Sequence, residues 1–260
     1  MINHIVQFSG GVCSFFAAKR VVEKFGTAET VLLFADTKME DEDLYRFIDE
    51  GAAYLKCPLV RIADGRTPWE VFKDERFLGN TRVDPCSKIL KRELLDAWCD
   101  KHAPKAIRYF GLDWTEDDRF TRLQNRMEAK GVPKEQIQAP MIQWRPLVDK
   151  PDMLGMLEQL GIKVPRLYTM GAAHNNCGMF CIKSGQAQFR LLLKTMPERD
   201  AFHEAKEEEL RAYLGKDVSI LRDRRGGTLK PLTLREFRKR IECGGDHDKH
   251  DWGGCGCAID

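Results

Sequence analysis

The sequence VQFSGGVCS, residues 6–14, joins two segments of different hydrophobic periodicity near the start of the chain. Residues 2–8 (INHIVQF) have the composition of a short buried strand, whereas residues 12–25 carry apolar side chains at helical spacing. A second apolar run, residues 30–35 (TVLLFA), precedes an acidic segment and an amphipathic helical pattern that extends to Ala53. This alternation of strand and helix predicts an α/β fold, a parallel twisted sheet with helices on both faces.

The same periodicities divide the rest of the chain into two parts. Residues 59–63 and 107–112 are predicted as further strands, with a helix over residues 88–101 between them. Farther along, the pattern becomes helical and cysteines crowd the last third of the sequence. We therefore expect an α/β domain over residues 1–150 and a helical, cysteine-rich C-terminal appendage over residues 151–260.

Composition limits the class of protein. The chain has 260 residues, a formal net charge of +2 and an apolar fraction of 43%. It shows no apolar run long enough to cross a bilayer and no basic-then-apolar leader, so we expect a cytoplasmic protein without a membrane partner. Nine cysteines in a reducing compartment favour metal ligation or redox chemistry over a disulfide framework.

The loop within the opening stretch has the properties of an anion site. A loop that leaves a parallel strand and enters a helix presents free backbone amides at the helix N-terminus, where anions bind. Gly10 and Gly11 let the backbone approach a phosphate closely, and Ser9 and Ser14 can add hydroxyl donors. The alternative is a plain glycine turn, and Cys13 in the first helical turn is expected to be a packing residue rather than a nucleophile.

The loop and three later motifs together resemble a known superfamily. The order S-G-G-x-x-S after an N-terminal strand is similar to the PP-loop of the adenine nucleotide α-hydrolase-like superfamily. Residues 32–40 (LLFADTKME), 84–91 (DPCSKILK) and 111–119 (GLDWTEDDR) resemble segments of its phosphoadenosine phosphosulfate (PAPS) reductase-like family. The resemblance implies a Rossmann-like fold, with residues 1–150 as the PP-loop nucleotide-binding domain, and an enzyme whose substrate is ATP or PAPS.

The resemblance also implies roles for individual residues. Nucleotide contacts are expected from Ser9, Gly10, Gly11, Ser14, Asp36, Thr37 and Lys88. Lys91 and Arg119 are expected to act in catalysis by neutralising charge on the transferring group. The alternatives are that Lys91 is a solvated helix residue and that Arg119 pairs with Glu116. Carboxylates near Glu40 are candidates for Mg²⁺ if the substrate is ATP.

Cysteines of the second half suggest a metal centre. Residues 174–185 (HNNCGMFCIKSG) and 253–260 (GGCGCAID) resemble a phage and mobile-element subgroup of the PAPS reductase-like family. The expected ligands are Cys86, Cys177, Cys181 and Cys257. Four thiolates suit a [4Fe–4S] cluster, which we favour, or a closed Zn²⁺ site. The alternative is that Cys86 is a buried core thiol and the tail cysteines hold zinc.

Three tail cysteines are candidates for the attacking thiolate. Glu242-Cys243-Gly244 is similar to the E-C-G tail of thioredoxin-dependent PAPS reductases, in which that cysteine attacks the sulfonate. Cys255 and Cys257 are equal candidates, as nucleophile or as fourth ligand. Either role requires a thiolate with a lowered pKa or a bound metal.

Three functions therefore remain open from the sequence. The enzyme could reduce an adenylyl sulfate with thioredoxin as reductant, an oxidoreductase reaction. It could instead cleave ATP to AMP and pyrophosphate and activate an oxygen of tRNA or DNA for sulfur transfer from a persulfide donor, with the basic runs 222–230 and 235–240 as the approach path. A non-catalytic nucleotide- or metal-binding regulator is the third alternative, and the sequence leaves open whether the chain forms a homo-oligomer.

Overall fold

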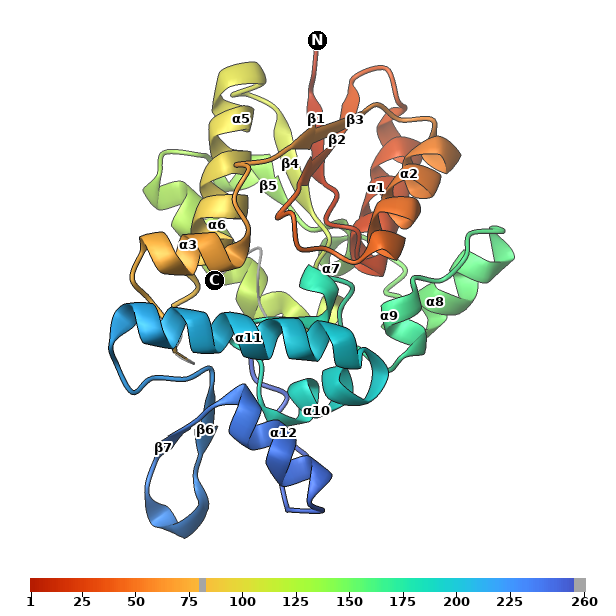
Figure 1. The fold of residues 1–260 in the computed structure, drawn as a ribbon. Helices are drawn as coiled ribbons and strands as arrows, with labels where there is room; N and C mark the ends of the chain where they lie inside the picture. The colour runs from red at the N-terminus through yellow and green to blue at the C-terminus, as the bar shows by residue number, and fades with distance from the viewer. Residues whose placement is uncertain (80–82, 255–260) are drawn as a thin grey trace.

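The computed structural model describes residues 1–79 and 83–254. Its centre is a five-stranded parallel sheet in the order β3-β2-β1-β4-β5 (Figure 1). The strands are β1 (His4–Gln7), β2 (Thr30–Ala35), β3 (Leu59–Ile62), β4 (Ile107–Phe110) and β5 (Ile137–Gln138). Every residue of β2 is buried, which explains why its sequence is a continuous apolar run rather than an alternation.

Helices cover both faces of this sheet, as the sequence predicts. On one face, α1 (Val12–Phe25) and α2 (Glu42–Leu55) pack in one apolar cluster with Val6. On the other face, α5 (Leu94–His102) packs in a second cluster with Ile5. Ile5 and Val6 belong to opposite clusters because successive side chains of a strand point to opposite faces.

The remaining helices differ more from the sequence-based expectation. They are α3 (Pro68–Asp74), α4 (Pro85–Ser87), α6 (Asp117–Ala129), α7 (Pro140–Gln143), α8 (Lys150–Gln159), α9 (Arg166–Thr169), α10 (Gln186–Thr195), α11 (Pro197–Leu214) and α12 (Leu234–Glu242). The helix expected over residues 88–101 begins earlier, at Pro85, and continues through a π-helical segment, Lys88–Glu93, into α5. Helix α3 was not expected, although its capping box of Thr67 and Glu70 is a readable start signal.

The C-terminal part is mainly helical but also contains a β-hairpin. Helix α8 packs on α1, whereas α10, α11 and α12 pack together with α3 around a separate apolar cluster. In Figure 1, α11 crosses below the sheet, and α12 and the hairpin lie beyond it. The hairpin pairs β6 (Leu221–Asp223) with β7 (Lys230–Leu232) in antiparallel register.

Some charges of the two basic runs are compensated by ion pairs inside the chain. Asp223 binds both Arg225 (2.7 Å) and Arg240 (2.8 Å), and Glu204 binds Arg238 (2.7 Å). The run 222–230 therefore lies on a β-hairpin whose charges are partly paired.

One buried histidine joins α3 to α11. His203 is fully buried, stacks on Phe180 with ring centroids 4.0 Å apart, and accepts a hydrogen bond from the Trp69 indole at 3.0 Å. Burial lowers the pKa of His203 to about 3, so its ring is neutral at physiological pH. The histidine therefore acts as a neutral packing and acceptor group.

The order of the strands places a crevice at one edge of the sheet. Strands β2 and β3 lie on one side of β1, and β4 and β5 lie on the other. In an open parallel sheet, ligands bind outside the carboxyl ends of the strands at the point where the order reverses, here between β1 and β4. Within the two described ranges, none of the helices has the length and apolar character needed to span a membrane.

Candidate functional site

The loop between β1 and α1 is shaped by two adjacent glycines. Gly10 has a φ of 81°, in the left-handed region, and a Cβ there would lie 2.7 Å from Cγ of Leu44. Gly11 is the N-cap of α1, with φ −85° and ψ 154°, and a Cβ there would approach the hydroxyl of Tyr168 no closer than 3.6 Å. The fold therefore requires glycine at position 10 but would accept a methyl group at position 11. Because Gly11 has no side chain, a phosphate can approach the N-terminus of α1 closely at this position.

Residues from the C-terminal part of the chain hold this loop. The amide of Val12 donates to the hydroxyl of Tyr168 at 3.1 Å, and the side-chain amide of Asn175 donates to the carbonyl of Gly10 at 2.8 Å. Both contacts join residues more than 150 positions apart. The geometry of the loop thus depends on the appendage as well as on the sheet.

The end of β4 meets the start of α1 without any side chain between them. A Cβ at Gly111 would lie 2.3 Å from Cα of Ser14, closer than real atoms come, so this position accepts only glycine. The hydroxyl of Ser14 donates to the carbonyl of Gly11 at 2.7 Å. The loop after β1 and the end of β4 are therefore parts of one wall of the crevice.

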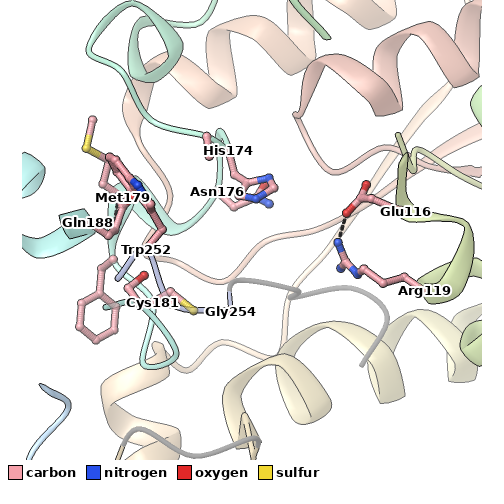
Figure 2. A pocket seen from close by; sticks show the side chains of 13 residues that line it. Glu116, Arg119, His174, Asn176, Met179, Cys181, Gln188, Trp252 and Gly254 are labelled. Atoms are coloured by element: carbon pink, nitrogen blue, oxygen red, sulfur yellow. Dashed lines mark hydrogen bonds and ion pairs between the residues drawn. The ribbon is translucent and has the colours of Figure 1, made fainter. Parts of the chain in front are cut away.

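Three adjoining pockets form a groove along this edge of the sheet. The sheet-edge pocket is mostly apolar and is lined by Gln7, Leu33, Ala35, Leu95 and Phe110, with Ser9, Lys91 and Gly111. The loop pocket shares Ser9, Lys91 and Gly111 with it and is completed by Gly11, Ser14, Lys150, Tyr168 and Asn175, with Glu116, Arg119, His174 and Asn176. These last four residues also line the outer pocket, a cavity of about 240 Å³ that extends to Trp252 (Figure 2). The shared residues show that the three pockets lie side by side.

Cationic side chains concentrate in the loop pocket. Lys91, Arg119 and Lys150 all line it. The side chain of Lys91 is 11% exposed and lies 3.5 Å from Oε1 of Glu40, so Lys91 is a buried groove residue rather than a solvated helix residue. Arg119 pairs with Glu116, as the spacing allows, and both residues line the groove. Glu40 and Glu116 each pair with one of these cations, so the N-terminus of α1 and Lys150 are the features that favour an anionic ligand.

Glu40 is a buried carboxylate whose two oxygens are both engaged. Its Oε1 accepts a hydrogen bond from Oγ1 of Thr37 at 3.0 Å and faces Lys91, and its Oε2 accepts one from the amide of Cys177. The carboxylate thus ties the segment after β2 to the cysteine loop. The Mg²⁺ role expected of the carboxylates near Glu40 stays a prediction.

Other residues expected to contact the nucleotide have partners of their own. Burial of Asp36 acts to raise its pKa, but hydrogen bonds from Lys38 and Tyr45 outweigh burial and hold the pKa below its usual value. Lys88 is exposed and pairs with Glu93 at 3.6 Å. The structure therefore gathers Ser9, Gly11, Ser14, Lys91 and Arg119 in the groove and places Asp36, Thr37 and Lys88 in other contacts.

The cysteine loop next to the groove has an unusual backbone. Cys177, Gly178 and Met179 all have positive φ values, and a Cβ at Gly178 would meet the guanidinium of Arg199 at 2.0 Å. Nζ of Lys91 lies 3.8 Å from Sγ of Cys177, and the amide of Lys183 donates to Sγ of Cys181 at 3.4 Å. Sγ of Cys177 also lies 4.0 Å from Oε1 of Glu40, so this sulfur lies between an ammonium and a carboxylate.

The four-cysteine ligand set stays a prediction. Cys177 and Cys181 are buried and Cys86 is partly buried, whereas Cys257 lies outside the described residues. Among residues 1–79 and 83–254, no three His, Cys, Asp or Glu side chains form a group that could hold a metal ion. The described residues thus supply soft donors of suitable chemistry, Cys177 and Cys181, but not a complete site.

The candidate nucleophiles and the core cysteines occupy different environments. Cys243 caps the C-terminal end of α12 and is exposed, whereas Cys255 lies outside the described residues. Cys13 is buried in the core, as expected, and burial raises the pKa of its thiol to about 12. A thiol with that pKa is protonated at physiological pH and is a poor nucleophile.

Several groove residues were not expected from the sequence. Tyr168 and Lys150 carry no local signal, because their positions depend on how the appendage packs on α1. His174, Asn175 and Asn176 stand directly before Cys177 in the cysteine motif, and that adjacency is the one signal by which they could have been found.

The tail returns to the cysteine loop across the outer pocket. Gly254 donates to the carbonyl of Lys183 at 2.9 Å, and Ala187 donates to the carbonyl of Asp251 at 2.9 Å. A Cβ at Gly185 would lie 2.1 Å from Oδ1 of Asp251. The backbones of the two segments are therefore in direct contact, and this contact brings Trp252 to the pocket.

Comparisons with known proteins add a distant structural likeness. No protein-family model matches the sequence, and no curated protein matches it. One similar solved structure is the NH3-dependent NAD synthetase from Campylobacter jejuni subsp. jejuni NCTC 11168 in complex with the nitrate ion. That structure is 12% identical in sequence, with a TM-score of 0.41, and the match covers 82% of this chain and 87% of that chain.

Proposed function

We propose that the chain is a PP-loop-type enzyme that binds ATP and cleaves it to AMP and pyrophosphate, activating an oxygen of a second substrate. The observation that carries this proposal is the pair of adjoining pockets at the point where the strand order reverses. The sheet-edge pocket is apolar and suits a base, whereas the loop pocket combines the bare backbone of Gly11 with cationic side chains and suits phosphates. The resemblance of residues 9–14 to a PP-loop agrees with this reading.

The groove can orient the nucleotide by three separate properties. The sheet-edge pocket offers Leu33, Leu95 and Phe110 to an adenine ring and the amide of Gln7 to its polar edge. The N-terminus of α1 then faces the phosphates, which Lys91 and Lys150 neutralise from the sides. Residues of this chain thus bind and position the nucleotide before any chemistry occurs.

The proposed reaction is a displacement at the α-phosphorus. An oxygen of the second substrate attacks, a new P–O bond forms, and the bond between the α-phosphorus and the bridging oxygen breaks. Pyrophosphate leaves with the electron pair of that bond, and the adenylated oxygen is then open to substitution by sulfur. Lys91, Lys150 and Arg119 would stabilise the charge that develops on the phosphates.

A second candidate function is supported by the cysteine loop. The ammonium of Lys91 near Sγ of Cys177, and Cys181 in the outer pocket, place sulfur beside the groove. A thiolate could attack the sulfur of PAPS, forming an S–S bond and breaking the S–O bond, with adenosine 3′,5′-bisphosphate as leaving group. Release of sulfite then needs two electrons from an external dithiol such as thioredoxin.

One assay separates these functions. Protein purified without oxygen is incubated with ATP or with PAPS, with and without thioredoxin or a persulfide donor, and both pyrophosphate and sulfite are measured. Pyrophosphate from ATP supports the first function, and sulfite from PAPS supports the second. If neither product forms while nucleotide still binds, both enzyme proposals are wrong and the chain is a nucleotide-binding regulator.

We keep the cysteine centre as a separate proposal. Cys177 and Cys181 would hold a [4Fe–4S] cluster, with Zn²⁺ as the alternative, together with Cys86 and Cys257. Such a group would supply sulfur or electrons beside the nucleotide groove. Analysis of iron, acid-labile sulfide and zinc in the purified protein tests it, and metal-free protein that retains full activity would contradict it.

A further inference from the structure

A groove of about 430 Å³ lies between α3 and α11, which run side by side (Figure 1). Among the residues that the structure describes, none lines both this α3–α11 groove and a pocket of the candidate site. Its floor includes the buried side chains of Trp69 and Leu210, and its rim consists of charged and aromatic side chains. The groove is therefore a separate surface feature that the proposed function does not use.

The α11 side of this groove carries one line of exposed side chains, the α11 stripe. Phe202, Lys206, Glu209 and Tyr213 follow one another at intervals of four, three and four residues. Both aromatic rings are 47% exposed, and the side chains of Lys206 and Glu209 are 37% and 60% exposed. This spacing places side chains along one line of a helix and is the spacing of the seam between two helices of a coiled coil. The stripe is thus a seam that the described part of the chain leaves exposed.

The chemistry of the α11 stripe is the same when the stripe is read in reverse. Phe202 and Tyr213 are equally far from the point between residues 207 and 208, and so are Lys206 and Glu209. In an antiparallel pair of α11 helices centred there, Phe202 lies against Tyr213 of the second copy. Lys206 lies against Glu209 of the second copy in the same way. A parallel pair would instead place each of these charges against its like charge, which is unfavourable.

We infer that the α3–α11 groove is the interface of a homodimer, in which the α11 stripes of two copies of this chain pack antiparallel. Such an interface is isologous, because the same surface of both copies meets about a twofold axis. The dimer would remove the rings of Phe202 and Tyr213 from water. Lys206 and Glu209 pair within one chain at 2.7 Å, and each would gain a second partner of opposite charge.

Helix α3 has the same reversible pattern of charges. Glu70 and Lys73 are exposed, line the groove and are three residues apart. Trp69 donates its hydrogen bond to His203, near one end of the stripe. Nζ of Lys73 lies 5.3 Å from the ring centroid of Tyr213, at the other end. The point between Glu70 and Lys73 therefore lies alongside the middle of the stripe, and the same twofold axis would bring Glu70 near Lys73 of the second copy.

Charge reversal on the α11 stripe tests both the interface and its direction. Sedimentation velocity of the whole protein over a range of concentrations should show a reversible dimer. Lys206→Glu would gather four carboxylates at the seam, and Glu209→Lys would gather four ammonium groups. Each should weaken dimerisation at least tenfold. The double variant Lys206→Glu, Glu209→Lys restores each opposite pair and should dimerise as the original protein does.

Two further variants complete the test. Phe202→Ala removes an exposed ring of the seam and should also weaken dimerisation, without any change of charge. Lys239→Glu makes the same change of charge as Lys206→Glu at an exposed position of α12, and it should leave the dimer unchanged. Near-ultraviolet circular dichroism of each variant shows whether it is folded.

Three results would overturn the inference. The first is a protein that stays monomeric at every concentration. The second is a dimer that neither single charge reversal weakens, which would place the interface elsewhere. The third is a folded double variant that does not recover dimerisation. The dimer does not rest on the proposed function, so a monomer that cleaves ATP would contradict the interface alone.

Discussion

Alanine at Gly11 and alanine at Gly10 should have opposite consequences, although the two positions are adjacent. At Gly11 the backbone is extended and the new Cβ would lie 3.6 Å from the nearest side-chain atom, an ordinary contact. Removing glycine where the native backbone suits alanine reduces the entropy of the unfolded chain and stabilises a protein by about 0.4–1 kcal/mol. The methyl group would nevertheless stand where the phosphate approaches. We expect Gly11→Ala to keep or raise stability and to weaken ATP binding at least tenfold, which is about 1.4 kcal/mol.

At Gly10 the expected loss is in the fold. A left-handed backbone costs an L-residue about 1–2 kcal/mol. The new Cβ would also lie 2.7 Å from Cγ of Leu44, a fully buried side chain that has little room to move. Overpacking of this kind typically costs about 1–3 kcal/mol. Together these terms predict that Gly10→Ala lowers the free energy of unfolding by about 2–5 kcal/mol.

Two measurements on each variant check this reasoning. Urea unfolding followed by circular dichroism gives the change in stability, and isothermal titration calorimetry with ATP gives the change in affinity. The account requires loss of affinity without loss of stability in Gly11→Ala, and loss of stability in Gly10→Ala. A Gly11→Ala protein that binds ATP as tightly as the original would refute the assignment of the loop to phosphate.

Three further substitutions test individual contacts that hold the loop, α11 and the C-terminal segment in place. Tyr168→Phe removes the acceptor of the Val12 amide, so the free energy of unfolding measured in urea should fall by about 1–3 kcal/mol, and an unchanged value would show that the contact is dispensable. His203→Asn keeps a hydrogen-bond acceptor but cannot titrate. Because the folded pKa of about 3 lies below the unfolded value of 6.5, the unfolded state takes up a proton that the folded state does not, and stability falls as pH decreases from 6.5 toward 3. The original protein should therefore lose about 1.4 kcal/mol per pH unit relative to His203→Asn over this range, and parallel pH profiles would contradict the assignment. Gly185→Ala should displace Asp251 and free the tail, which limited trypsin digestion would detect as faster cleavage of the C-terminal segment.

The central sheet could be predicted from the sequence because buried parallel strands are apolar runs. The helix expected over residues 12–25 and the strand expected over residues 30–35 have the same bounds in α1 and β2. The β-hairpin near residue 225 is not predicted from the sequence, because each of its strands is three residues long and each carries a basic residue, Arg222 or Lys230. Short strands give too few residues to establish a period of two.

The candidate site was predictable only where its chemistry is local. Gly11 and Lys91 could be named because they belong to motifs that lie at strand and helix ends. Lys88 and Lys91 are three residues apart, yet one is exposed and the other buried, a difference set by the π-helical turn and by the buried Glu40. Tyr168 reaches the loop from far along the chain, and such long-range packing leaves no trace in local sequence.

The most direct test of the central claim is an NMR titration of protein labelled with ¹⁵N-glycine. The chain has 21 glycines, so the amide signals of Gly10 and Gly11 can be assigned by comparison with the alanine variants. The account predicts that ATP shifts the Gly11 signal strongly and that adenosine, which lacks phosphates, does not. Binding of ATP, confirmed by calorimetry, that leaves the signals of both Gly10 and Gly11 in place would contradict it.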